Sequence, residues 1–362
     1  MDFFLAVISS FVFSFFAINL LRPVAIKIDL VDKPSERKNH IGHVPLIGGV
    51  AIFCSVLTSS SMWLTIDSEL FVYLFSAGLM VCLGVVDDKH DISVRSRVAF
   101  QVLVATFMIV AMDNYIIDLG DLLFFGNVEL GKFGILLTYL AIVAIINAFN
   151  MVDGIDGLLG SMAISTLSSI ALLLLLKQQE NLFTVLVIVA ILPYLIFNLG
   201  VFGTQYRKIF MGDAGSMFIG FTVVWLLIDN TQGPSATFRP VTALWIVAVP
   251  LIDMGSIIIR RIKKGSSPFK ADREHIHHLL LKAGFSKLQT LIIIVALSVS
   301  CSLIGVLTEW LEFNESVMFV SFLLFFMLYN LVLSDSSRLK RPLKLIKLKN
   351  LKRKRCQKLV RG

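Results

Sequence analysis

Charged residues are scarce in this chain, and their scarcity excludes an ordinary soluble domain. Only 16% of the 362 residues are charged, against roughly 25% in typical soluble domains. Hydrophobic residues make up 56% of the sequence, with 29 phenylalanines among them, and the mean hydropathy is +0.83. The composition therefore indicates a polytopic membrane protein.

Cysteine is also scarce, and the positions of the four cysteines exclude a disulfide framework and a cysteine metal site. Cys54, Cys82 and Cys301 lie in apolar runs and Cys356 lies in a basic tail, without the spacing that either feature needs. The sequence also lacks an internal repeat, a linker rich in proline or serine, and the alternating pattern of β-strands. A single all-α domain is therefore the economical interpretation.

Eleven apolar segments have the length of membrane spans. The first lacks a positively charged n-region and a small-residue cleavage site, so we interpret it as a membrane anchor and not as a cleaved signal peptide. A transmembrane domain is thus predicted for residues 1–334, followed by a basic tail at 335–362. The predicted spans cover residues 3–21, 45–63, 70–86, 98–112, 134–150, 160–176, 182–200, 214–228, 241–258, 289–307 and 317–334.

The basic residues predict the orientation of these spans. Lysine and arginine concentrate in the cytoplasmic loops of membrane proteins. If the spans alternate from a periplasmic N-terminus, thirty of the 33 basic residues fall in the cytoplasmic loops and the C-terminal tail. The sequence therefore predicts a periplasmic N-terminus and a cytoplasmic C-terminus. The twelve basic residues of the tail fit contact with the anionic lipid bilayer better than contact with nucleic acid.

A polar ladder emerges from the fifth predicted span. Asn147, Asn150, Asp153 and Asp156 recur at every third residue, so in a helical or 3₁₀ conformation they share one side. This stripe would be roughly 13 Å long, comparable to a sugar diphosphate. The alternative is a helix cap followed by a solvated turn.

Two further acidic motifs are predicted at the cytoplasmic face. Asp87 and Asp88 end the third span, where adjacent carboxylates favour a divalent metal or an acid/base pair, although a soluble loop start is the alternative. Asp213 begins the eighth span among glycines whose backbone N–H groups would favour phosphate. Because an aspartate there would repel phosphate, we expect Mg²⁺ or Mn²⁺ between them. Alternatively, Asp213 only caps the helix.

The loop before the tenth span carries a histidine motif. His275 and His278 are expected on one helix face and His277 on another, which makes a three-histidine zinc site geometrically poor. With Arg273, these side chains would suit a diphosphate or a transition-state charge. A surface amphipathic helix is the alternative. Asn198, at the end of the seventh span, would offer an amide to a nucleobase or phosphate, or would cap its helix.

Together, the Asp-Asp pair, Asn-Ala-Phe-Asn-Met-Val-Asp-Gly-Ile-Asp-Gly, Phe-Met-Gly-Asp-Ala-Gly-Ser and His-Ile-His-His resemble, in order and spacing, the motifs of the polyprenyl-phosphate N-acetylhexosamine-1-phosphate transferases. The resemblance covers residues 1 to about 334. The muramoyl-pentapeptide branch of that family carries three consecutive histidines, so the sequence His-Ile-His-His favours the aminosugar branch. That branch implies transfer of N-acetylglucosamine-1-phosphate from UDP-N-acetylglucosamine to undecaprenyl phosphate in the bacterial inner membrane, with release of UMP. The step would initiate synthesis of enterobacterial common antigen and O-antigen lipopolysaccharide.

The resemblance also implies roles for individual residues. Asp213 would be a magnesium ligand, and Asp87 and Asp88 would lie near the metal and the lipid phosphate. Asp153 and Asp156 would help to bind the nucleotide-sugar. The remaining candidates for substrate binding are amide or basic side chains: Asn147, Asn150, Asn198, Lys38, Arg273, His275, His277 and His278.

The first cytoplasmic loop departs from the paralogous branch. The lysine of that branch has no obvious equivalent before Pro45, and Lys38 or His40 is assigned in its place. In the reaction, an oxygen of the lipid phosphate would attack the sugar-bearing phosphorus of the donor. A phosphate monoester has its second pKa near ~6, so it hardly needs a general base at neutral pH. We therefore expect Asp87 to position the metal or the nucleophile more than to remove a proton.

Other readings stay open from the sequence. A sister transferase with another UDP-sugar, or one serving teichoic acid synthesis, would share every motif named above. The oligomeric state is open as well, with a homodimer among the alternatives. An anion transporter is the rival from another class, but transporters tend to place ionisable residues near the bilayer midplane and in repeated halves. Here the acidic motifs lie at the predicted cytoplasmic ends of the spans.

Overall fold

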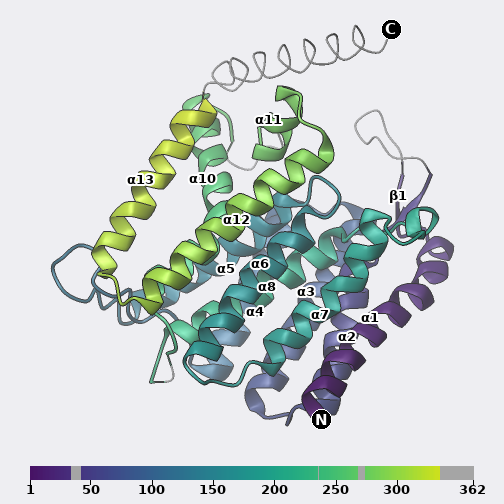
Figure 1. Cartoon of the computed structure of the whole chain (residues 1–362), viewed down its shortest axis with the longest axis horizontal. Coiled ribbons are helices and arrows are strands. Elements are labelled where there is room, and N and C mark those ends of the chain that lie inside the picture. The colour runs from purple at the N-terminus through teal and green to yellow at the C-terminus, as the bar shows by residue number, and fades with distance from the viewer. Residues whose placement is uncertain (34–41, 235, 268–273, 335–362) are drawn as a thin grey trace, which may run out of the picture.

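The structure, a computed structural model, describes residues 1–33, 42–234, 236–267 and 274–334. This part of the chain folds into a bundle of helices (Figure 1). The helices are α1 (Asp2–Lys27), α2 (Gly48–Trp63), α3 (Ser68–His90), α4 (Val94–Met112), α5 (Phe133–Val152), α6 (Leu158–Leu176), α7 (Leu182–Leu199), η1 (Thr204–Arg207), α8 (Gly212–Thr231), α9 (Pro240–Ile246), α10 (Ala248–Lys263), α11 (Ile276–Ala283), α12 (Lys287–Trp310) and α13 (Glu315–Ser334).

The polytopic all-α architecture predicted from the sequence is confirmed, with a correction to the number of spans. Each of the eleven apolar segments falls on a helix or, for the ninth, on a pair of helices. Among the described residues, however, nine helices are long and apolar enough to cross a membrane, or ten if one bent pair counts as a span. The second segment, α2, has only 16 residues, about 24 Å of helix against a hydrocarbon core of about 30 Å.

The ninth predicted span is broken between α9 and α10. The two helices meet at 79°, and Val247 between them has a non-helical backbone. Pro250 explains the break, because it has no N–H to donate to the carbonyl of Ile246 and its ring would clash with that carbonyl in a continuous helix. The hydroxyl of Ser302 in α12 donates to the Ile246 carbonyl instead, at 3.1 Å. The freed backbone group is therefore satisfied inside the bundle.

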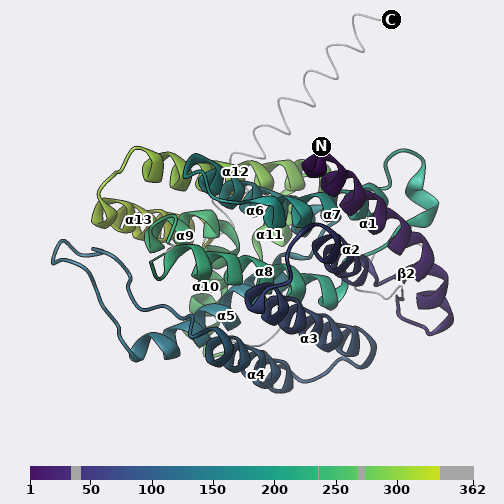
Figure 2. The same cartoon turned by 90° about the horizontal axis from the view of Figure 1, so that it is seen from below.

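Helix α8 forms the centre of the bundle. It contacts α2, α3, α5 and α6, and Figure 2 shows it enclosed by the other helices. Its first turn approaches its neighbours closely because small residues face one another. A methyl group at Gly84 of α3 would overlap the backbone of Ala214, and one at Gly49 of α2 would overlap the backbone of Gly215. Small residues allow this kind of close helix packing in membrane proteins, and here they fix the start of α8.

A short sheet, which the sequence did not predict, ties the first loop to the start of α8. Strands β1 (Val31–Asp32) and β2 (Val44–Pro45) pair antiparallel, and Leu46 then forms a parallel bridge with Phe210. The backbone N–H of Gly48 donates to the Phe210 carbonyl at 2.9 Å. Strands of two residues are too short to leave a periodic pattern in the sequence. Their effect is to hold the 31–33 segment beside the residues that precede α8.

Candidate active site

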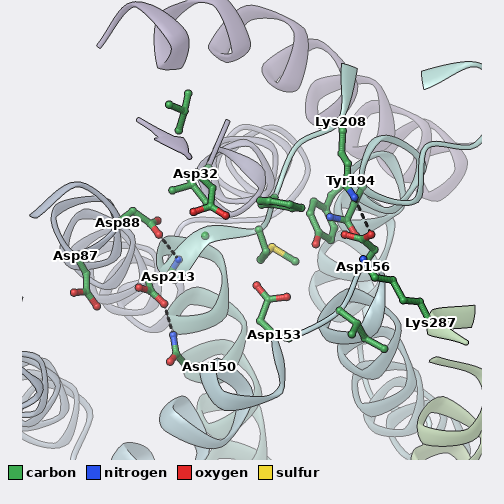
Figure 3. A pocket seen from close by; sticks show the side chains of 18 of the residues that line it. Asp32, Asp87, Asp88, Asn150, Asp153, Asp156, Tyr194, Lys208, Asp213 and Lys287 are labelled. Atoms are coloured by element: carbon green, nitrogen blue, oxygen red, sulfur yellow. Dashed lines mark hydrogen bonds and ion pairs between the residues drawn. The ribbon is translucent and has the colours of Figure 1, made fainter. Parts of the chain in front are cut away.

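A cavity of about 860 Å³ lies where α3, α5 and α7 end and where α6 and α8 begin (Figure 3). Eight residues predicted as site residues line it: Asp87, Asp88, Asn150, Asp153, Asp156, Asn198, Asp213 and His278. Further lining residues with polar side chains, which the sequence analysis did not single out, are Asp32, Asp91, Tyr194, Lys208, Lys282 and Lys287. Asn147, His275 and His277 do not line the cavity. Lys38 and Arg273 lie outside the described residues.

Asp88 caps the start of α8 from the neighbouring helix α3. Its carboxylate accepts hydrogen bonds from the backbone N–H groups of Asp213 at 2.8 Å and Ala214 at 3.2 Å. A carboxylate at a helix N-terminus is stabilised by unpaired N–H groups and by the helix dipole. The expectation that these N–H groups would bind phosphate is therefore wrong, because Asp88 already occupies them. The expectation that Asp213 caps the helix with its own side chain is also wrong, since no side chain caps α8 from the N-cap position.

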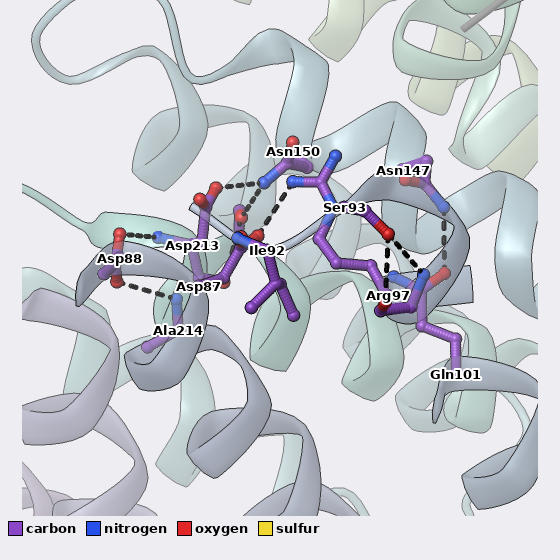
Figure 4. A network of polar contacts seen from close by, with 12 residues as sticks. Asp87, Asp88, Ile92, Ser93, Arg97, Gln101, Asn147, Asn150, Asp213 and Ala214 are labelled. Atoms are coloured by element: carbon purple, nitrogen blue, oxygen red, sulfur yellow. Dashed lines mark hydrogen bonds and ion pairs between the residues drawn. The ribbon is translucent and has the colours of Figure 1, made fainter. Parts of the chain in front are cut away.

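Asp87 points away from Asp88 and pairs with Arg97 of α4 (Figure 4). One carboxylate oxygen of Asp87 lies 2.8 Å from the Arg97 guanidinium. The other accepts a hydrogen bond from the backbone N–H of Ile92 at 3.0 Å. Asp87 is only 3% exposed, and a buried carboxylate needs such partners. The repulsion expected between adjacent aspartates is thus relieved by separate partners for each one.

Asp213 enters the cavity beside Asn150. The Asn150 amide donates to Asp213 at 2.5 Å and to the Ser216 hydroxyl at 2.8 Å, so one residue of α5 is fixed against the first turn of α8. Figure 3 shows Asp213, Asp153 and Asp88 directed toward the same space. This convergence comes from three different helix ends and gives the cavity its acidic character.

The polar ladder of the sequence is not one continuous stripe. Helix α5 ends at Val152, and α6 begins only at Leu158, so Asp153 and Asp156 lie in the loop between the helices. Asn147 is one turn deeper in α5 and donates to Gln101 of α4 at 3.0 Å. The prediction that all four polar residues share one side of a helical segment is therefore wrong, because the chain leaves the helical conformation at Asp153.

Asp156 is paired with Lys208, a residue that the sequence analysis counted only as a basic loop residue. The Lys208 ammonium lies 2.7 Å from the Asp156 carboxylate and 5.2 Å from the centre of the Phe210 ring. Both the ion pair and the aromatic ring favour a cation at this position. A lysine thus lies at the edge of the cavity, 52 residues from its partner in the sequence.

Asp153 projects into the cavity, where water reaches it, while protein surrounds it on the other sides. Partial desolvation by the surrounding protein raises the pKa of Asp153 to about 7, and the charges of Asp213 and Asp156 add to the effect. The carboxyl group is therefore partly protonated at neutral pH. An approaching cation would favour its ionised form.

Asn198 connects two loops of the site through both ends of its amide. Its oxygen accepts a hydrogen bond from the backbone N–H of Gly157 at 2.6 Å, and its nitrogen donates to the carbonyl of Ile209 at 2.9 Å. Asn198 is 3% exposed. This geometry is that of a residue that holds the 153–157 loop against the segment before α8, and its contact with substrate stays a prediction.

The three histidines take different positions from those expected. His275 is the N-cap residue of α11 and not part of the helix, so it does not share a helix face with His278. His275 and His277 are buried, whereas His278 lines the cavity. Burial lowers the pKa of His277 to about 3, with smaller contributions from His278 and His275, so its ring is neutral. The loop residues Glu274 and Lys264 form an ion pair next to this motif.

The donor atoms of the cavity suit Mg²⁺ better than a soft metal. Carboxylate oxygens are the hard ligands that Mg²⁺ prefers. Among the described residues, no three His, Cys, Asp or Glu side chains are grouped as ligands of one ion. Mg²⁺ commonly binds through one or two carboxylates and completes its shell with waters and substrate phosphates. The residues present therefore fit an ion that binds together with a phosphorylated substrate.

An acidic cavity of this kind, at one end of a bundle of apolar helices, fits an integral-membrane enzyme that acts on phosphate groups with a divalent cation. The family model described as "Glycosyl transferase family 4" matches residues 70–231. Three similar proteins carry the name undecaprenyl-phosphate alpha-N-acetylglucosaminyl 1-phosphate transferase. The protein of Salmonella typhi is 44% identical over 96% of this chain and 95% of its own length. That of Escherichia coli (strain K12) is 43% identical with the same coverage.

The third relative, from Haemophilus influenzae, is 42% identical over 93% of this chain and 96% of its own length. The chain belongs to glycosyl transferase family 4, whose members named above are phosphoglycosyltransferases.

Proposed function

We propose that this protein transfers N-acetylglucosamine-1-phosphate from UDP-N-acetylglucosamine to undecaprenyl phosphate and releases UMP. An oxygen of the lipid phosphate attacks the sugar-bearing phosphorus, the bond from that phosphorus to UMP breaks, and a new diphosphate joins lipid to sugar. The relatives named for this reaction support the proposal through their similarity along almost the whole chain. The observation that carries it is the cavity itself, where five aspartates from distant motifs meet at one helix-bundle end.

The charge of the cavity supports a role for a divalent cation. Donor and acceptor are both anionic, and they would enter a space lined by Asp87, Asp88, Asp153, Asp156 and Asp213. We propose that Mg²⁺, with Mn²⁺ as an alternative, binds at Asp213 with Asp87 and Asp88 nearby. When bound, the ion neutralises phosphate charge and orients the reacting groups.

The basic side chains at the cavity supply the complementary charge from the protein. Lys208, Lys287 and His278 line the cavity, and in Figure 3 Lys208 and Lys287 lie near Asp156. Ammonium groups bind phosphate as point charges. We propose that these three side chains bind the diphosphate of the donor. A phosphate oxygen would then share the Lys208 ammonium with the Asp156 carboxylate, its ion-pair partner in the structure.

No side chain needs to act as a strong base in this scheme. The lipid phosphate is mostly dianionic at neutral pH, since its second pKa is near ~6. Asp87 has both oxygens engaged by Arg97 and Ile92, so its carboxylate is held in one orientation. These fixed contacts at the edge of the cavity support the prediction that Asp87 positions the metal or the nucleophile more than it removes a proton.

We further propose that the cavity faces the cytoplasm from the bacterial inner membrane. Basic residues lie at the cavity end of the bundle, at the end of α3 and the start of α4 (Lys89, Arg95 and Arg97) and in the segment after α7 (Arg207 and Lys208). An excess of basic residues marks the cytoplasmic side. Helices such as α1 and α13 expose large apolar side chains along their length, as contact with lipid tails requires. A lipid acceptor lying against the bundle would present its phosphate at this end.

The proposal is tested with purified protein in detergent, undecaprenyl phosphate, Mg²⁺ and radiolabelled donor. We expect lipid-extractable label and released UMP with UDP-N-acetylglucosamine but not with UDP-N-acetylgalactosamine, and no label with the Asp213→Ala variant. Label from the second donor alone would move the chain to a sister transferase. Absence of label from both donors would overturn the proposed reaction.

A further inference from the structure

A buried carboxylate outside the cavity joins three elements around the histidine motif. Asp253 lies in α10 and is 1% exposed. It accepts hydrogen bonds from the backbone N–H of Ile276 at 3.1 Å and from the hydroxyl of Tyr329 in α13 at 2.8 Å. His275 Nδ1 lies 2.9 Å from its second oxygen. In the tautomer with the hydrogen on Nδ1, His275 donates to this oxygen.

The three histidine rings form a row from Asp253 to the cavity. The rings of His275 and His277 are stacked, with centroids 5.6 Å apart and planes within 8°. The next pair, His277 and His278, have centroids 4.2 Å apart. Of the three, only His278 lines the cavity. The row therefore connects a fixed anchor in α10 to a side chain at the site.

His277 also contacts the loop that carries two cavity aspartates. A methyl group added at Gly154 would overlap the His277 ring. The backbone of Gly154 does not have a positive φ, so its conformation does not itself exclude alanine, and the three atoms nearest to an added methyl group all belong to the His277 ring. Gly154 directly follows Asp153 in the chain. The position of His277 therefore bears on the position of Asp153.

We propose that Asp253 is a positioning residue for the transfer reaction and that it acts through the histidine row. It holds the start of α11 against α10 and α13, so that His277 seats on Gly154 and His278 faces the donor. The histidines then have separate roles. His275 binds Asp253 and holds the start of α11, His277 packs against the 153–157 loop, and of the three only His278 contacts substrate. The inference rests on the proposed function and names how one side of that site is supported.

The kinetic test compares Asp253→Asn with Glu309→Gln in the purified enzyme. Asparagine can still accept from Ile276 and Tyr329, so the fold is retained, but its NH₂ group cannot accept from Nδ1–H of His275, and this tautomer of His275 loses its partner. Loss of a hydrogen-bond partner that orients a metal-ligating histidine typically lowers metal affinity or activity about 10-fold to 100-fold. We expect an effect of similar size for a histidine row that orients a substrate-binding side chain. We expect the KM for UDP-N-acetylglucosamine to rise about 10-fold or more, with the KM for undecaprenyl phosphate unchanged.

Glu309 is the matched control, because it is also a buried acid held by hydrogen bonds, in its case to Arg239 and Thr242. These residues do not line the cavity. We expect Glu309→Gln to leave both KM values unchanged. Equal effects of Asp253→Asn on both substrates, or the same donor effect in Glu309→Gln, would overturn the proposal.

A steric rescue tests the contact between His277 and Gly154. Gly154→Ala should lower kcat/KM for the donor, and Gly154→Ala/His277→Ala should recover part of the loss, because the second change removes the obstacle to the first. A double variant no better than Gly154→Ala would overturn this step. Hydrogen exchange without substrate gives a readout that is independent of turnover. Asp253→Asn should increase exchange in both 276–283 and 153–157, and Glu309→Gln in neither.

These readouts also separate the two proposals. A wild-type protein that shows no transfer would overturn the proposed function, while the exchange pattern would still decide whether Asp253 positions the loop. If the wild-type protein is active but Asp253→Asn leaves hydrogen exchange in 153–157 unchanged, only the positioning role of Asp253 is overturned.

Discussion

Replacement of Asp87 by asparagine separates a positioning carboxylate from a general base. In the structure Asp87 accepts from Ile92 and pairs with Arg97 at 2.8 Å. Whichever way an asparagine amide turns, its NH₂ group faces one of these donors. The loss of one hydrogen bond between charged groups costs about 1.5–3 kcal/mol. If this free energy is added to the activation barrier, the rate falls about 10-fold to 100-fold, since about 1.4 kcal/mol corresponds to a factor of ten.

The pH profile gives the decisive measurement. A missing general base would matter less as the lipid phosphate loses its own second proton, near pH ~6. A missing positioning group has no such dependence. We therefore expect the ratio of wild-type to Asp87→Asn initial rates, measured as label in the lipid extract, to stay constant between about pH 6.5 and 9.

Arg97→Met provides the companion variant, because it removes the same ion pair from the other side and leaves Asp87 in place. It should lower the rate with the same flat pH profile, whereas Arg97→Lys should retain more activity. Recovery of Asp87→Asn at high pH would refute the reasoning. So would an Arg97→Met enzyme with the wild-type rate.

Three further predictions concern packing, charge and pH. Gly84→Ala should lower the Tm in detergent, since overpacking against Ala214 costs about 1–3 kcal/mol, and Gly78→Ala, which meets only the flexible Phe53 side chain, should not. Lys208→Met should raise the KM for the donor about 10-fold, because a diphosphate would lose a cation, and Lys208→Arg should restore most of it. Because Asp153 has a pKa of about 7, raising the pH from 6 to 8 should tighten Mn²⁺ binding measured by electron paramagnetic resonance, and Asp153→Asn should reduce this change.

The sequence predicted the helical segments well because long apolar runs are sufficient to specify them. It predicted less well where a single residue changes the backbone inside such a run. Pro250 was visible in the ninth segment, but the hydropathy of the run hides the 79° bend that it produces. The end of α5 at Val152 was hidden in a similar way, because the three-residue spacing continues through a segment that is no longer helical.

The convergence of the motifs could be predicted because alternating spans place them at the same end of the bundle. The sequence could not predict which groups each of these side chains contacts. Asp88 binds N–H groups 125 and 126 residues away, and this contact depends on the close packing of α3 against α8 at Gly84. Arg97, Lys208 and Asp253 were visible as charged residues, but only the tertiary structure pairs each of them with its partner.

The partners divide the five cavity aspartates that the sequence motifs predicted into two groups. Asp87 has Arg97, Asp88 has the N-terminus of α8, and Asp156 has Lys208. Asp213 accepts instead from the neutral amide of Asn150, and Asp153 forms no ion pair within the described ranges of the chain.

A divalent cation gains most from carboxylates whose charge is not already compensated. Of the three proposed metal-binding residues, Asp213 is the one held neither by an ion pair nor by a helix N-terminus. We therefore expect Asp87 and Asp88 to contribute chiefly by holding α4 and α8 in place around it. Asp87 and Asp88, the adjacent pair that first suggested a metal, are thus expected to matter more for the shape of the site than for binding the cation. The single aspartate at the start of α8 is the residue on which we expect the cation to depend.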